Sequence, residues 1–141
     1  MTGGTMEIRK IGIVGSGTMG TGIAQVAATS GFEVLLHDIA QEYLDHSLKT
    51  MDKSLAKLAE KGKIAEDREK ILERIRTSAN IQAFKDVDFI VEAVFEDFEV
   101  KKKVLLEIDK LLAPEVILTS NTSSISITRL AALTSRPSKF M

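Results

Sequence analysis

The sequence has no cysteine, no tryptophan and only two prolines in 141 residues. Without cysteine the chain can form neither a disulfide nor a thiolate metal site, which is typical of a reducing compartment. Its 19 basic and 20 acidic residues nearly cancel, at a formal net charge of -1, so we expect no nucleic acid and no anionic membrane as partners. No apolar run approaches the roughly 20 residues of a membrane span, and the N-terminal segment lacks the layout of a secretory signal. These absences predict a cytoplasmic protein without a bound metal.

Short apolar runs alternate with helical patterns along the whole chain. The runs predicted as strands cover residues 8–14, 32–37, 77–81, 87–93 and 116–119. The patterns predicted as helices cover residues 18–30, 41–61, 100–112 and 125–133, with a further helix from about residue 66. Strand–helix alternation of this kind predicts an α/β fold, a doubly wound and mostly parallel sheet, in one domain over residues 1–141.

A helical hairpin is predicted between the second and third strands, at about residues 41–76. In its first helix, apolar residues recur at intervals of three or four and form one stripe. They are Leu44, Leu48, Met51, Leu55 and Leu58. Gly62 then interrupts the pattern. Because the hairpin is longer than a strand–helix–strand crossover needs, we expect it to project from the sheet and to contribute to function.

A glycine motif, G-x-G-x-x-G, stands between the first predicted strand and the first predicted helix. We expect Gly15 to make the tight turn, Gly17 to leave room for a pyrophosphate, and Gly20 to let the helix lie close to the sheet. The free N–H groups and the dipole at that helix N-terminus favour phosphate. The residues predicted to contact the cofactor here are Gly15, Ser16, Gly17, Thr18, Met19 and Gly20.

Asp38 supplies the acidic residue that such a motif requires about 20 positions later. It lies 18 residues after Gly20 (38 − 20), at the end of the second predicted strand. The pattern therefore predicts a dinucleotide-binding Rossmann fold. A carboxylate here accepts hydrogen bonds from the ribose 2′-hydroxyl of NAD, and it would repel the 2′-phosphate of NADP by roughly 4 kcal/mol at 4 Å and an effective dielectric constant of 20. Ile39 follows instead of an arginine, so the predicted cofactor is NAD.

Two later segments resemble the 3-hydroxyacyl-CoA dehydrogenase family, most of all its 3-hydroxybutyryl-CoA type. They are Val91-Glu92-Ala93-Val94-Phe95-Glu96-Asp97 and Ser120-Asn121-Thr122-Ser123-Ser124. The opening segment, residues 11–20, is also similar to the family. The resemblance extends from about Ile8 over essentially the whole chain. It implies an NAD-dependent oxidoreductase that interconverts 3-hydroxyacyl-CoA and 3-oxoacyl-CoA in fatty acid or butanoate metabolism.

The resemblance implies roles for four residues near the reacting end of the cofactor. Glu96 would lie near the nicotinamide-side ribose, Lys101 would contact the cofactor, and Asn121 would lie beside the nicotinamide. Ser123 would bind the C3 oxygen of the substrate, a catalytic role, because a hydroxyl can donate to a developing negative oxygen. Plainer interpretations stay open: Glu96 and Lys101 could be solvated charges at a helix start, and Ser123 could be a helix cap.

The resemblance also implies that the helical hairpin binds the coenzyme A part of an acyl-CoA substrate, through Ser54 and Lys61. A lysine on an exposed hairpin can meet a phosphate as a point charge. A polar helix face commonly carries such residues, however, so a purely structural role for both is an open alternative.

The sequence departs from the family in its catalytic base. In the family a histidine, oriented by a glutamate, accepts the proton of the C3 hydroxyl, and it follows a pattern like Arg136-Pro137. That histidine is absent here, as is the C-terminal helical domain through which the family forms homodimers. His37 and His46 are the only histidines. We therefore expect residues 1–141 to bind NAD and to be inactive alone. The alternatives are a stand-alone NAD-binding module, or a related β-hydroxyacid dehydrogenase for a free acid.

Overall fold

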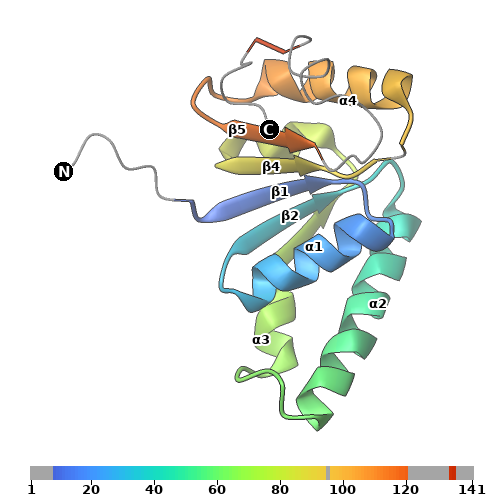
Figure 1. Cartoon of the computed structure of the whole chain (residues 1–141), viewed down its shortest axis with the longest axis vertical. Coiled ribbons are helices and arrows are strands. Elements are labelled where there is room, and N and C mark those ends of the chain that lie inside the picture. Colours follow the sequence, from blue (N-terminus) through green and yellow to red (C-terminus); the bar gives the residue numbers. More distant parts are fainter. Residues whose placement is uncertain (1–7, 95, 121–133, 136–141) are drawn as a thin grey trace, which may run out of the picture.

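A computed structural model of the chain describes residues 8–94, 96–120, 134 and 135. Within these residues, five parallel strands form one sheet in the order β3-β2-β1-β4-β5 (Figure 1). The strands are β1 (Lys10–Val14), β2 (Glu33–His37), β3 (Ile75–Ser78), β4 (Phe89–Glu92) and β5 (Ile117–Ser120). The helices are α1 (Thr18–Thr29), α2 (Gln41–Glu60), α3 (Arg68–Glu73), the 3₁₀ helix η1 (Ile81–Asp86) and α4 (Phe98–Leu111). The predicted doubly wound α/β fold is confirmed. The helix predicted at residues 125–133 lies outside the described residues.

Helices cover both faces of the sheet and divide the core in two (Figure 1). On one face, α1, α2 and α3 pack around residues such as Leu36 and Met51. On the other face, α4 and η1 pack around residues such as Phe84 and Leu105. Strands buried on both faces are nearly continuous apolar runs, which is why the sequence showed them clearly. Because the strands are parallel, their carboxyl ends meet at one edge of the sheet, where ligands of such folds bind.

Helices α2 and α3 form the hairpin, and its apolar stripe holds it to α1 and the sheet. Leu44, Met51 and Leu55 are fully buried, and each such side chain contributes about 1.5–3 kcal/mol relative to an exposed one. The Arg68–Asp52 ion pair between the two helices spans 3.0 Å but is about half exposed, so it contributes at most about 1 kcal/mol. Burial of the stripe, rather than surface charge, therefore decides where the hairpin lies.

Arg74 fixes the base of the hairpin. Its guanidinium donates to the Ala28 carbonyl oxygen at 2.8 Å and to both carboxylate oxygens of Glu66, at 2.8 and 2.5 Å. The hydrogen bonds from Arg74 hold the pKa of Glu66 below its ordinary value, and the same pairing raises the pKa of Arg74. The end of α1, the segment before α3 and the start of β3 are thereby joined at one side chain.

The predicted edge strand at residues 77–81 was wrong in its position. Strand β3 begins at Ile75, directly after α3 ends, and residues 81–86 form η1 instead. Ile75 is buried against the sheet, although its spacing also fitted the helical pattern before it. The Asn80 side chain accepts a hydrogen bond from the Gln82 amide at 3.0 Å and so begins η1. None of the helices in the described part of the chain is long and apolar enough to cross a membrane.

Candidate functional site

The candidate site lies at the carboxyl edge of the sheet, between β1 and β4. At this point the order of the strands reverses, since β1 leads through α1 to β2 on one side while β4 and β5 lie on the other. A crevice at such a switch point is where open α/β sheets bind ligands. The glycine motif follows β1, Asp38 follows β2, and Glu96 follows β4. Predicted contacts from three separate segments therefore reach the same edge.

The glycines of the motif occupy positions that differ in what a side chain would meet. Gly15 has a φ of +106°, and an added Cβ would lie 2.5 Å from the Ala93 carbonyl oxygen. A Cβ at Gly20 would lie 1.7 Å from the Gly15 carbonyl oxygen, so α1 starts directly against the turn. A Cβ at Gly17 would meet no described atom within 4 Å. The turn and the close approach thus require glycine for the fold, whereas the space at Gly17 is open for a ligand.

The N-terminus of α1 offers the N–H groups that a phosphate would accept from. Gly17 is the residue that caps this helix, and among the described residues no side chain caps it by a hydrogen bond. Thr18 and Met19 form the first turn and are exposed, and they border an apolar hollow of about 500 Å³ along the flank of α1. An uncapped helix N-terminus with open space at Gly17 is suited to a pyrophosphate.

Asp38 is held against the glycine motif. Its Oδ2 accepts hydrogen bonds from the Ser16 amide at 2.8 Å and the Ser16 hydroxyl at 2.6 Å, and its Oδ1 accepts one from the Ile39 amide at 2.7 Å. Ser16 is buried and turned toward this carboxylate. Asp38 is only half-buried, so its carboxylate has a fixed direction and remains accessible to a ribose hydroxyl. The residues present therefore fit a dinucleotide.

A second buried contact, which sequence reasoning missed, ties the motif to the hairpin. The Thr21 hydroxyl donates to the Ser16 carbonyl oxygen at 2.8 Å, and it lies 2.6 Å from the Ser47 hydroxyl on α2. Because the Thr21 hydrogen goes to Ser16, Ser47 donates in this pair. No sequence signal marks Thr21 or Ser47, since hydroxyl residues are common on helices and their partners lie far along the chain.

Lys101 and Glu96, which were predicted to lie at the nicotinamide side of the cofactor, differ in how deeply they are buried. Lys101 is fully buried, and its Nζ lies 2.8 Å from Glu92 Oε2 and 3.6 Å from Glu96 Oε1. The Glu96 side chain is 35% exposed. Asp97 begins α4, because its Oδ1 accepts from the amides of the first turn. The structure thus brings Glu96 and Lys101 together, and it adds Glu92, to which we had given no role. Asn121 and Ser123 lie outside the described residues.

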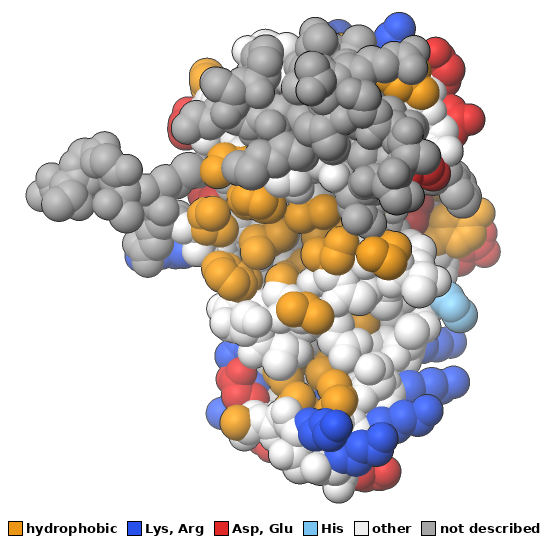
Figure 2. All heavy atoms as spheres, in the orientation of Figure 1, with side chains coloured by type: hydrophobic (Ala, Val, Ile, Leu, Met, Phe, Trp, Pro, Cys, Tyr) orange, Lys and Arg blue, Asp and Glu red, His pale blue; other side chains and the backbone are white. Residues whose placement is uncertain are grey.

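The two predicted coenzyme A contacts lie on α2 and directly after its end, away from the glycine motif. The Ser54 hydroxyl accepts a hydrogen bond from Gln25 Nε2 on α1 at 2.9 Å, and Lys61 is exposed just after the helix ends. Figure 2 shows lysine and arginine side chains gathered at the end of the hairpin farthest from the sheet. The exposed lysines of α2 and its C-terminus are Lys49, Lys53, Lys57 and Lys61. A spacing of four residues places them along one side of the helix.

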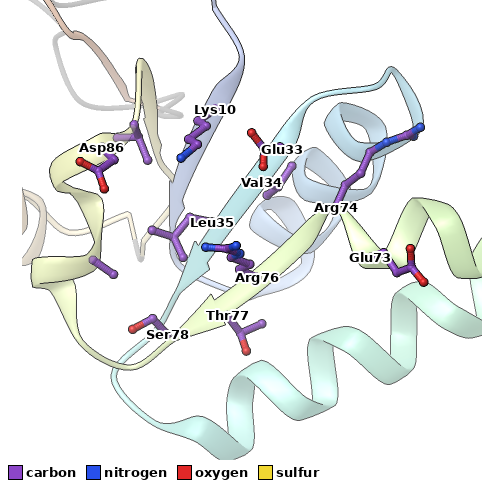
Figure 3. A pocket seen from close by; sticks show the side chains of 12 residues that line it. Lys10, Glu33, Val34, Leu35, Glu73, Arg74, Arg76, Thr77, Ser78 and Asp86 are labelled. Carbon is purple, nitrogen blue, oxygen red and sulfur yellow. The ribbon is translucent and has the colours of Figure 1, made fainter.

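A cavity of about 330 Å³ lies over β1, β2 and β3 beside η1 (Figure 3). Lys10 and Glu33, at the starts of β1 and β2, line it together with Arg76 and Asp86. The cavity is therefore lined at the amino ends of β1 and β2, opposite to the edge where the glycine motif lies, and along β3 as far as Ser78. Its charges are mixed in sign, so they define no preference for an anion or a cation. We do not assign it to the candidate site.

A parallel sheet with a glycine turn at the switch point and an aspartate after the second strand defines a dinucleotide-binding domain of the Rossmann type. Residues 10–141 match the family model described as 3-hydroxyacyl-CoA dehydrogenase, NAD binding domain, and the chain belongs to that family. The predicted family and its NAD cofactor are confirmed.

The names of similar proteins are consistent with membership of this family. A probable 3-hydroxybutyryl-CoA dehydrogenase of Deinococcus radiodurans is 47% identical over 132 residues, which cover 94% of this chain and 48% of the relative. The alpha subunit of a fatty acid oxidation complex of Idiomarina loihiensis is 45% identical over 96% of this chain and 19% of its own length. The crystal structure of (S)-3-hydroxybutyryl-CoA dehydrogenase from Ralstonia eutropha has a TM-score of 0.92 at 44% identity, covering 95% of this chain and 48% of that one. The chain thus spans about half the length of these two 3-hydroxybutyryl-CoA dehydrogenases.

Proposed function

We propose that this chain is the cofactor-binding part of an enzyme that interconverts 3-hydroxyacyl-CoA and 3-oxoacyl-CoA with NAD. The observation that carries the proposal is the open space at Gly17 beside the fixed carboxylate of Asp38, in a chain of this dehydrogenase family. Relatives named 3-hydroxybutyryl-CoA dehydrogenase make a short acyl chain the first substrate to test.

The residues of the carboxyl edge would hold NAD by its separate parts. The glycine motif would bind the pyrophosphate at the N-terminus of α1, and Asp38 would accept from the hydroxyls of the adenosine ribose. Glu96, supported by Lys101 at 3.6 Å, would accept from the nicotinamide-side ribose, and Asn121 would lie beside the nicotinamide. NAD supplies the hydride acceptor of the reaction, and the chain supplies position and charge.

The C3 oxygen of the substrate would accept a hydrogen bond from Ser123. This serine follows Ser120, the last residue of β5, by three positions. A hydroxyl donor at this place would stabilise the oxygen as it becomes negative, without a change in its own charge.

We expect neither histidine of the chain to serve as the proton acceptor of the reaction. The His37 ring is buried, with its Nδ1 2.8 Å from the Ser78 carbonyl oxygen and its ring edge-on to Phe84. His46 is exposed on α2. We therefore expect residues 1–141 to bind NADH without oxidising it when acetoacetyl-CoA is added, as followed by NADH absorbance. Steady turnover would show that these residues contain a base that we have not identified. Loss of NADH binding would remove the proposed function altogether.

The hairpin is proposed to hold coenzyme A through Ser54 and Lys61, because the exposed lysines of α2 offer several charges to its phosphates. Lys61→Glu is expected to weaken coenzyme A binding about 3- to 10-fold, the scale of an exposed charge that is reversed, and to leave NADH affinity unchanged. Calorimetric titration with coenzyme A and with NADH measures both. Lys85→Glu, the same substitution at an exposed position of η1, is the control. Equal losses of coenzyme A affinity in Lys61→Glu and Lys85→Glu would mean that the hairpin has only a structural role.

A further inference from the structure

Glu92 is a fully buried carboxylate whose two oxygens are both occupied. It is the last residue of β4. Its Oε1 accepts a hydrogen bond from the Ser120 hydroxyl at 2.5 Å, and its Oε2 accepts from the Val94 amide at 2.7 Å and from Lys101 Nζ at 2.8 Å. Burial of a charge costs several kcal/mol unless its partners are well placed. Ile90, on the same strand, is instead buried among apolar side chains.

Lys101 connects this buried carboxylate to an exposed one. Its Nζ lies between Glu92 Oε2 at 2.8 Å and Glu96 Oε1 at 3.6 Å, and it also donates to the Val94 carbonyl oxygen at 3.3 Å. Glu92 and Lys101 are 0% exposed, whereas Glu96 is 35% exposed. The cluster therefore runs from the interior of the domain to the carboxyl edge, and its lysine cannot turn to solvent without removing the positive charge that pairs with Glu92.

Glu92 also holds the end of β5. Ser120 closes this strand and immediately precedes Asn121, and its hydroxyl is bound to Glu92 Oε1. One carboxylate thus joins the ends of two strands, the loop after β4 and the first turn of α4. On the other side of the switch point, the Asp38 carboxylate has its own support from Ser16 and Ile39. The hydrogen bonds that hold Asp38 therefore include neither Glu92 nor Lys101.

We propose that Glu92 is a positioning residue for the nicotinamide half of the NAD site. It places the Lys101 ammonium, through which the Glu96 carboxylate is directed to the nicotinamide-side ribose, and it fixes the end of β5 before Asn121. Glu92 itself touches no ligand. This inference rests on the proposed function. If Glu92 merely tied α4 to the sheet, its loss would affect the adenosine and nicotinamide halves of the site alike.

Glu92→Gln removes the charge and nearly keeps the shape. We expect NADH binding to weaken about 10-fold, within the range for residues that act through a neighbour. ADP, which lacks the nicotinamide and its ribose, should bind as it does to the unaltered chain, because the Asp38 carboxylate is held by Ser16 and Ile39 rather than by Glu92 or Lys101. Fluorescence titration gives the NADH affinity, calorimetry gives the ADP affinity, and thermal unfolding reports stability. Glu107→Gln, the same substitution at an exposed position of α4, should change neither affinity.

Ser120→Ala is the second variant, and it decides the matter if Glu92→Gln does not fold. It removes one hydrogen bond to Glu92 and leaves the ion pair with Lys101 intact, and it should weaken NADH binding by a smaller factor with ADP binding unchanged. Equal losses for NADH and ADP, or no loss for either, in the variant that folds would overturn the role of Glu92. If the unaltered chain binds neither NADH nor ADP, the proposed function itself fails.

Discussion

Gly17→Val is expected to weaken NADH binding by at least about 100-fold, or about 2.7 kcal/mol, in a protein that still folds. Gly17 has a φ of -69° and a ψ of -166°, an extended conformation that valine adopts readily. A Cβ at this position meets no described atom within 4 Å. The branched side chain would instead fill the space through which the pyrophosphate must approach the N-terminus of α1. Fluorescence titration with NADH and thermal unfolding separate the two effects.

Two other glycines of the same region provide matched controls. Gly22→Val adds the same side chain to the exposed outer side of α1, where a Cβ also meets no described atom, and it should leave NADH affinity unchanged. Gly20→Ala should damage folding as well as binding, because its Cβ would lie 1.7 Å from the Gly15 carbonyl oxygen. Full NADH affinity in a folded Gly17→Val protein would mean that the pyrophosphate does not bind at this turn.

Asp38→Asn is expected to narrow the preference for NADH over NADPH from about 10³-fold to about 10-fold or less. The charge on Asp38 would repel a 2′-phosphate by roughly 4 kcal/mol at 4 Å, which corresponds to about 10³-fold in affinity, and asparagine carries no such charge. Asparagine also accepts fewer of the hydrogen bonds from Ser16 and Ile39. A modest loss of stability is therefore expected alongside.

The ratio of the NADH and NADPH dissociation constants is the quantity to compare, since a general loosening of the loop changes both. Asp45→Asn, at an exposed position on α2, should leave that ratio as it is in the unaltered chain. An unchanged ratio in Asp38→Asn would mean that the carboxylate does not face the ribose.

The parallel sheet and the glycine motif could be predicted because short stretches of sequence are enough to indicate both. Strands covered on two faces are short apolar runs, and the three glycines stand at a fixed spacing within six residues. The start of β3 could not be placed in this way. Ile75 fits the spacing of the preceding helix as well as it fits a strand. Arg74, between α3 and β3, bonds to Glu66 and to Ala28, which is 46 residues away.

Site residues that lie within one sequence motif could be predicted, whereas contacts between residues far apart in the sequence could not. The resemblance pointed to Lys101 as a cofactor contact, and only the structure shows its ammonium buried between two carboxylates. Glu92 stood inside the quoted motif without a role, because its partner Ser120 is 28 residues away. Thr21 and Ser47, 26 residues apart, were likewise invisible. Such contacts depend on which strands and helices become neighbours in the fold, and the periodicity of the sequence does not specify which ones do.

The most direct test of the account is a side-by-side titration of the unaltered 141-residue chain with NADH and NADPH. Saturable NADH binding, with NADPH about 10³-fold weaker, is the result expected from a pyrophosphate at the turn and a carboxylate facing the ribose. Equal affinity for the two cofactors, tighter binding of NADPH, or no binding of NADH would contradict the assignment of the glycine motif and Asp38 as an NAD site.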